Sequence, residues 1–114
     1  MKSPSVPAAP SQPVALVTGA SRGIGEAIAV LLTSRGYQMI APSRAELDLS
    51  DPSSVDRYVA GHREWRVDVL INNAGVNLLG TIRELEDQSW QTMLQTNLNA
   101  ALRLIQAFAP GMQQ

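Results

Sequence analysis

A glycine-rich turn constrains this chain more than any other feature of its sequence. Four apolar residues, 14–17, lie between Pro13 and Gly19 and are typical of a buried strand. The sequence Thr-Gly-Ala-Ser-Arg-Gly-Ile-Gly follows over residues 18–25, where an apolar pattern of helical spacing begins. Glycines at such a junction let the backbone approach an anion, and free N–H groups at the helix start point toward it. The turn therefore predicts a phosphate site, and a tight β–α turn that merely needs glycine is the alternative.

Composition narrows the function classes. The net charge of −1 argues against a nucleic-acid partner, because such proteins normally carry a basic surplus or face. The chain has no cysteine, which excludes disulfides, a thiol nucleophile and a cysteine metal site, and its one histidine, His62, excludes a His-pair zinc site, so we expect no metal. No Gly-Lys pair is present, which excludes a P-loop. No apolar run is long enough for a transmembrane helix and no secretory signal is seen, so we expect no membrane partner and a cytoplasmic location.

The chain divides into a tail and one folded unit. Residues 1–13 carry a proline at every third position from Pro4 on and predict a disordered, proline-rich tail. Residues 14–114 alternate apolar runs with helical patterns. We expect strands over 14–17, 37–41, 46–49 and 67–71, and helices over 23–35, 52–62 and 87–108, the last stopped by Pro110-Gly111. Almost wholly apolar strands in this order predict a parallel sheet covered on both faces.

A second motif makes the interpretation more specific. Asn72-Asn73-Ala74-Gly75 directly follows the strand expected over 67–71. Together with the glycine-rich turn, it resembles the two fingerprints of the short-chain dehydrogenase/reductase family, and the resemblance covers residues 14–114. It implies an α/β, Rossmann-type, doubly wound parallel sheet, present here as an incomplete N-terminal half with strand order 3-2-1-4.

The resemblance also implies a nicotinamide dinucleotide site. The pyrophosphate and ribose would lie against the glycine-rich turn, and Thr18 would tie the first strand to the turn after residues 67–71. Asp48 resembles the family's aspartate at the end of its third strand, which faces the adenine amino group; a surface turn residue is the alternative. The residues expected at the cofactor on this basis are Thr18, Gly19, Ser21, Gly23, Ile24, Gly25, Asp48, Asn73, Ala74 and Gly75.

The end of the second strand indicates which nucleotide is preferred. An NAD enzyme places a carboxylate about 20 residues beyond the glycine motif, to bind the ribose 2′-hydroxyl. Ser43 and Arg44 stand there instead, and Arg22 could add a second cation. A hydroxyl and a guanidinium suit a 2′-phosphate, so we expect NADP rather than NAD, although both arginines could be surface residues. Few residues separate Arg44 from Asp48, so the family's helix between the second and third strands is absent, and Glu46 could draw Arg44 away from a phosphate.

The helix expected over 87–108 carries one candidate catalytic residue. Asn97 falls within an apolar stripe and should therefore be hydrogen-bonded. The run Thr96-Asn97-Leu98 resembles the family's active-site asparagine, which positions a water in a proton relay; an asparagine bonded to a nearby backbone carbonyl is the alternative. The stripe consists of Trp90, Met93, Leu94, Leu98, Ala101, Leu102, Ile105 and Phe108.

The family's other catalytic groups, a serine and a Tyr-x-x-x-Lys sequence, are not found in this chain. Four residues beyond Tyr37 and Tyr58 stand Ala41 and His62, and Lys2 is the single lysine. The resemblance therefore implies the cofactor-binding half of an NAD(P)-dependent oxidoreductase, inactive alone, whose parent moves a hydride between nicotinamide and a carbonyl or alcohol substrate.

A second hypothesis is a truncated, non-catalytic module for NADP(H) binding or protein interaction. An open strand edge and half-covered helices would then be association sites. The helix expected over 87–108 is also similar to those that build dimer interfaces in the family, which makes a homo-oligomer a candidate partner.

Overall fold

The computed structural model describes residues 12–77 and 80–113, so most of the predicted tail lies outside the described part of the chain. Three parallel strands form one sheet in the order β2-β1-β3. They are β1 (Val14–Val17), β2 (Gln38–Ile40) and β3 (Val69–Ile71). The register pairs Leu16 with both Ile40 and Leu70, so β1 is the central strand.

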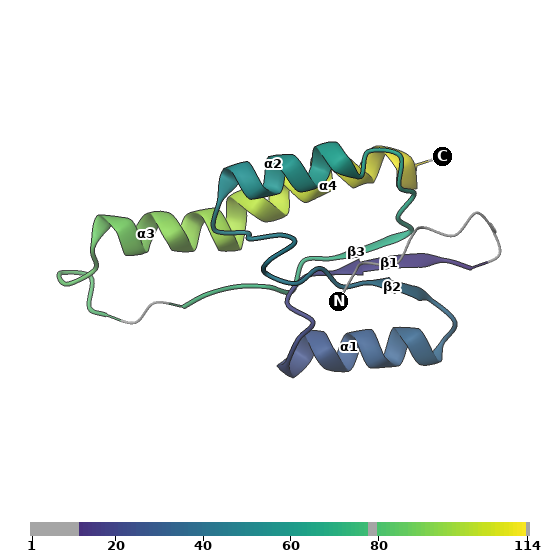
Figure 1. Cartoon of the computed structure of the whole chain (residues 1–114). Helices are drawn as coiled ribbons and strands as arrows, with labels where there is room; N and C mark the ends of the chain where they lie inside the picture. Colours follow the sequence, from purple (N-terminus) through teal and green to yellow (C-terminus); the bar gives the residue numbers. More distant parts are fainter. Residues whose placement is uncertain (1–11, 78–79, 114) are drawn as a thin grey trace.

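Helices cover both faces of this sheet, as the sequence predicted. The helix α1 (Gly23–Ser34) lies on one face, and α2 (Pro52–Gly61) and α4 (Ala100–Met112) lie on the other (Figure 1). Asp51 caps α2 by accepting a hydrogen bond from the Ser53 N–H, with Pro52 in the first turn, as that sequence predicted. No helix in the described residues is long and apolar enough to cross a membrane.

The core lies between the sheet and the pair α2 and α4. Side chains alternate between the two faces of a strand, so Val14 and Leu16 join this core while Ala15 and Val17 point to the face under α1. The buried members of the core cluster are Val14, Leu16, Ile40, Leu47, Val55, Tyr58, Val67, Ala100, Leu104 and Phe108.

The prediction of a strand over residues 46–49 is wrong. The predicted order 3-2-1-4 therefore lacks its strand 3, and the strand predicted as the fourth is the observed β3. The Leu47 N–H donates to the Ser43 carbonyl over 2.8 Å, which closes a local turn where a ladder was expected. A return to the sheet as a parallel strand needs a crossover of about a dozen residues or more. Only five residues separate β2 from Glu46, too few for that crossover.

The single helix predicted over 87–108 is also interrupted. It consists of α3 (Asp87–Leu94), a π-helical turn η1 (Gln95–Asn99) and α4, and Pro110 lies inside α4 near its end and does not stop it. A π turn takes more residues than an α turn, so the face that follows it is displaced from the predicted stripe. Ala100, Leu104 and Phe108 are the buried positions of α4. The predicted stripe members Trp90, Leu98, Leu102 and Ile105 are instead exposed.

Candidate functional site

A cavity of about 470 Å³ opens at the carboxyl end of the sheet. It lies where the connections after β1, β2 and β3 approach η1. In open parallel sheets, ligands bind outside the carboxyl ends of the strands, where the chain switches direction across the sheet. The cavity is lined by Thr18, Gly19, Ala20, Ser21, Ala41, Pro42, Ser43, Arg44, Leu47, Asp48, Leu49, Ser50, Ala74, Gly75, Val76, Thr92 and Thr96.

Thr18 joins the two sequence motifs, as predicted. Its hydroxyl oxygen accepts hydrogen bonds from the backbone N–H groups of Asn73 and Ala74, both over 3.1 Å. The Asn73 side-chain amide donates back to the carbonyls of Thr18 and Gly19 over 3.2 and 3.1 Å. Since Thr18 is buried, these bonds hold the turns after β1 and β3 in one fixed arrangement.

The glycines of the turn are required by space and by backbone conformation. Gly19 has φ of 68°, in the left-handed region, and a Cβ there would stand 3.0 Å from the Ala74 Cα. A Cβ on Gly25 would overlap the Gly19 carbonyl oxygen and the Asn73 side-chain amide. The missing Cβ atoms therefore let the start of α1 pack directly against the turn.

The start of α1 lies beside the cavity and does not line it. Arg22 is the N-cap residue and makes no side-chain capping bond, so the first-turn N–H groups have no side-chain partner from that position. Of the predicted cofactor residues, the cavity brings together Thr18, Gly19, Ser21, Ser43, Arg44, Asp48, Ala74 and Gly75. It does not include Arg22, Gly23, Ile24, Gly25 or Asn73 in its lining.

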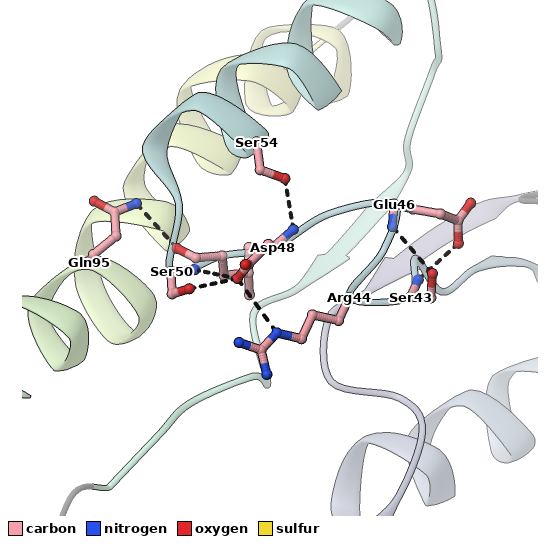
Figure 2. A network of polar contacts seen from close by, with 8 residues as sticks. Ser43, Arg44, Glu46, Asp48, Ser50, Ser54 and Gln95 are labelled. Atoms are coloured by element: carbon pink, nitrogen blue, oxygen red, sulfur yellow. Dashed lines mark hydrogen bonds and ion pairs between the residues drawn. The ribbon is translucent and has the colours of Figure 1, made fainter.

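The connection from β2 to α2 forms one wall of the cavity and is fixed by its own hydrogen bonds (Figure 2). The Ser43 N–H donates to Glu46 Oε1 over 2.9 Å, and the Glu46 N–H donates to Ser43 Oγ over 3.3 Å. This reciprocal pair is the pattern of a capping box on a single turn. Arg44 Nε lies 3.9 Å from Asp48 Oδ1, so the ion pair of this wall joins Arg44 to Asp48.

Asp48 is held at both its backbone and its side chain. Its N–H donates to Ser54 Oγ over 2.8 Å, which fastens it to α2. Its Oδ1 accepts from the Ser50 hydroxyl over 2.7 Å and from the Ser50 N–H over 3.1 Å. The Ser50 hydroxyl bond is the main cause that lowers the pKa of Asp48; the Ser50 N–H and Arg44 act in the same direction and burial opposes them.

The opposite wall comes from α3 and η1, which the sequence did not point to. Gln95 Nε2 donates to the Leu49 carbonyl over 3.2 Å and ties this wall to the β2–α2 connection (Figure 2). Thr92 and Thr96 line the cavity one helical turn apart. The Thr96 side chain is buried, and its hydroxyl has no hydrogen-bond partner among the described residues. The one signal that could have found it is its place directly before Asn97.

Asn97 is placed differently from its prediction. It is exposed, because the π turn carries it off the buried face of the helix. Asn97 is hydrogen-bonded, as expected, and its partner is backbone, as in the alternative interpretation. Its Oδ1 accepts from the Val76 N–H over 2.7 Å and its Nδ2 donates to the Val76 carbonyl over 2.8 Å. These bonds tie η1 to the segment after Gly75. A Cβ atom added at Gly75 would lie 3.3 Å from Asn97 Oδ1.

Together these features define a class of protein. A parallel α/β sheet, a cavity at its carboxyl edge and a glycine turn without room for Cβ atoms form a nucleotide-binding site. A cavity of this volume has room for an adenosine group, and its lining is mainly apolar with a few polar groups, as is usual in ligand sites. Within the described part of the chain, no group of three metal-binding side chains comes together.

Comparison with known proteins then gives the family. The sequence model described as short chain dehydrogenase matches residues 43–114, and the chain belongs to this family. It is 33% identical over 121 residues to the 3-oxoacyl-[acyl-carrier-protein] reductase FabG of Escherichia coli strain K12, covering 89% of this chain and 50% of that protein. It is 32% identical to the NADP-dependent 3-hydroxy acid dehydrogenase YdfG of Salmonella typhi, covering 87% of this chain and 48% of that protein.

Solved structures agree with this assignment. A metagenomic short-chain oxidoreductase in complex with NADP is 35% identical, with a TM-score of 0.79 over 88% of this chain and 56% of that one. L-Sorbose reductase from Gluconobacter frateurii, complexed with NADPH and L-sorbose, is 29% identical, with a TM-score of 0.70 over 90% of this chain and 48% of that one.

The chain spans about half the length of the curated relatives that it matches. About 101 of its 114 residues fall within the 121 residues aligned to FabG, so about 20 positions of that relative have no counterpart here. This shortening agrees with the brief connection between β2 and α2.

Proposed function

We propose that the cavity binds the adenosine end of NADP(H), and that this chain is the cofactor-binding half of a short-chain oxidoreductase. The observation that carries the proposal is the link through Thr18. It fixes the glycine turn and the Asn-Asn-Ala-Gly turn around one cavity, so the two fingerprints act as one site. The relatives that support it are a reductase, FabG, and a dehydrogenase, YdfG.

The parts of the nucleotide would be held by different walls of the cavity. The pyrophosphate would lie against the turn and the first N–H groups of α1, where helix dipole and backbone donors favour an anion. Asp48 would accept from the adenine amino group, since an ionised carboxylate accepts hydrogen bonds and donates none. We assign the pyrophosphate and ribose contacts to Gly19, Ser21, Arg22, Gly23, Ile24, Gly25, Asn73, Ala74 and Gly75.

The preference for NADP over NAD rests on Ser43 and Arg44. Both line the cavity, and no carboxylate stands at either of these positions. The Ser43 oxygen accepts from the Glu46 N–H, which leaves its own O–H as a donor for a phosphate oxygen. Two solved relatives were crystallised with NADP or NADPH as the bound cofactor, which supports the same preference.

The parent oxidoreductase would act on a small carbonyl or alcohol substrate, and the nicotinamide would supply or accept the hydride. This chain's part in that chemistry is to bind and orient the nucleotide. Asn97 would position a water in the proton relay, held in place by its two hydrogen bonds to Val76. We expect no turnover by the 114-residue chain alone, because its sequence holds no Tyr-x-x-x-Lys.

An association surface also belongs to the proposal. Trp90, Leu98, Leu102 and Ile105 are exposed apolar side chains on α3, η1 and α4. Exposed apolar residues along consecutive helical segments can form an interaction site. A second copy of the chain, packed through these helices, is the proposed partner, and sedimentation of a Leu102→Asp variant should show loss of the dimer.

Thermal unfolding of the 114-residue chain with and without NADPH tests the nucleotide proposal. A ligand at 100 times its Kd stabilises the folded state by about 2.7 kcal/mol, so a clear rise in Tm is expected with NADPH and a smaller one with equal NADH. The Gly25→Ala variant should lose the rise, while Gly61→Ala, in open space at the end of α2, should keep it. No rise with either nucleotide would contradict the proposal.

A further inference from the structure

The connection from β2 to α2 is rigid at both ends, although it has no regular secondary structure. Its first turn is closed by the Ser43–Glu46 pair and by the Leu47 N–H bond to the Ser43 carbonyl. Its second half is fastened to α2 through Asp48 and Ser54. A ligand that enters the cavity therefore meets a wall that cannot rearrange without breaking several hydrogen bonds.

The two charges on this wall differ in freedom. The Asp48 carboxylate is held by two hydrogen bonds from Ser50 and its side chain is 34% exposed. The Arg44 side chain is 85% exposed, and among the described residues its ion pair is the 3.9 Å contact with that carboxylate (Figure 2). The anion is thus the fixed member of the pair and the cation is the mobile one.

We propose that Asp48 is a specificity-determining residue of the nucleotide site, because its fixed carboxylate holds Arg44 and opposes a phosphate on the ribose 2′-position. This inference rests on the proposed function. Arg44 attracts a 2′-phosphate, but it must share its charge with Asp48, so the preference for a 2′-phosphate is smaller than Arg44 alone would give.

The short connection is the physical origin of this coupling. It places the cation and the carboxylate four residues apart on one wall of one cavity. At about 4 Å in water, a pair of unit charges changes a binding constant by about five-fold, and more where the pair is partly buried. An effect of that size is enough to decide between two nucleotides that differ by one phosphate.

The test compares adenosine 5′-phosphate with adenosine 2′,5′-bisphosphate on the full 114-residue chain, by isothermal titration calorimetry at low salt. The ratio of the two Kd values isolates the 2′-phosphate, because contacts to the base cancel. Asp48→Asn keeps an oxygen that can accept from Ser50 and should raise the preference for the 2′-phosphate by about five-fold. The rise should shrink at 1 M salt, where the Debye length falls to about 3 Å.

A matched control is available three residues away. Asp51→Asn removes the same charge, but Asp51 lies outside the cavity lining, and asparagine caps a helix about as well as aspartate. The ratio should not change in this variant. An equal rise in Asp51→Asn would overturn the inference, because net charge alone would then explain it.

A second variant keeps the inference falsifiable if Asp48→Asn folds poorly. Arg44 is exposed, so Arg44→Gln should fold normally. With the cation gone, the fixed carboxylate should make the 2′-phosphate unfavourable, and the variant should bind the 5′-phosphate more tightly than the 2′,5′-bisphosphate. Equal affinity for both would show that Asp48 does not act on the phosphate. If the unmodified chain binds neither nucleotide, the proposed function itself is overturned, and the inference falls with it.

Discussion

The two faces of the sheet are covered to very different degrees. On the face of α2 and α4, Leu104 is fully buried and Phe108 nearly so, within one continuous core. On the other face, Gly25 is the buried residue of α1, while Ile24, Val30 and Leu31 are exposed. The first helix is therefore attached through close backbone contact at its start, whereas α4 is attached through packed side chains. An apolar stripe predicts a helix, but it does not tell how much of that stripe the folded chain covers.

The largest expected effect tests this contrast directly. Leu104→Ala should lower the free energy of unfolding by about 3 kcal/mol, because it leaves a cavity in the core between α4 and the sheet. Leu31→Ala is the matched control, since that side chain on α1 is 51% exposed and its loss should cost no more than about 0.5 kcal/mol. Urea unfolding followed by circular dichroism measures both. Equal losses would contradict the difference between the faces.

The next prediction concerns what holds α1. Gly25→Ala should cost about 1–3 kcal/mol of stability, because the new Cβ would overlap the Gly19 carbonyl and force the helix away from the turn. Gly61→Ala, in the last turn of α2 with open space around it, should instead gain about 0.5–1 kcal/mol. Thermal unfolding distinguishes the two. A stabilised Gly25→Ala variant would mean that the glycine is not needed for the close approach.

Much of this arrangement followed from the sequence, because local patterns specify it. Apolar runs predicted all three strands, and the family resemblance of the two motifs implied the Thr18 link that joins them. The failures have a common cause. The strand expected over 46–49 and the straight helix over 87–108 were both judged from local pattern. The first was excluded by the length of the crossover and the second by a π turn.

The cavity shows the same division between local and long-range information. Its glycine and Ser-Arg walls follow from motifs, whereas Leu47, Leu49, Thr92 and Thr96 reach it through the packing of distant elements. Two threonines one helical turn apart form no pattern that distinguishes a cavity wall from a solvent face. Their place in the cavity wall follows from the packing of η1 beside the β2–α2 connection, to which Gln95 fastens it.

A buried hydroxyl on η1, at the wall of the cavity, offers a substitution that should raise stability. Thr96 is only 8% exposed, and its hydroxyl has no partner among the residues described. Thr96→Val keeps the shape and removes the unpaired group, so it should raise stability by about 1 kcal/mol. In the control Thr92→Val, the lost hydroxyl accepts from Gln88 Nε2 over 3.4 Å, and no gain is expected. A loss of stability in Thr96→Val would show that the hydroxyl is bonded in solution.

The smallest expected effect lies at the carboxyl edge between the two faces, where Asp48 joins the β2–α2 connection to the packed side. Its pKa in the folded chain lies below the ordinary value of an aspartate carboxyl, chiefly because the Ser50 hydroxyl donates a hydrogen bond to the carboxylate. Because the pKa of Asp48 is lower in the folded than in the unfolded chain, the ionised carboxylate stabilises the native state at pH values above the unfolded pKa. This stabilisation is lost as the pH falls through the folded pKa.

Since the carboxylate is partly exposed, the contribution should stay below about 1 kcal/mol. Unfolding midpoints of the unmodified chain and Asp48→Asn should differ at about pH 6 and converge as the pH falls through the folded pKa and Asp48 takes up a proton. Asp51→Asn serves as the reference for a carboxylate outside the cavity. A difference that persists unchanged at low pH would mean that Asp48 contributes through shape and not through charge, and the boundary between the two faces would then be held by packing alone.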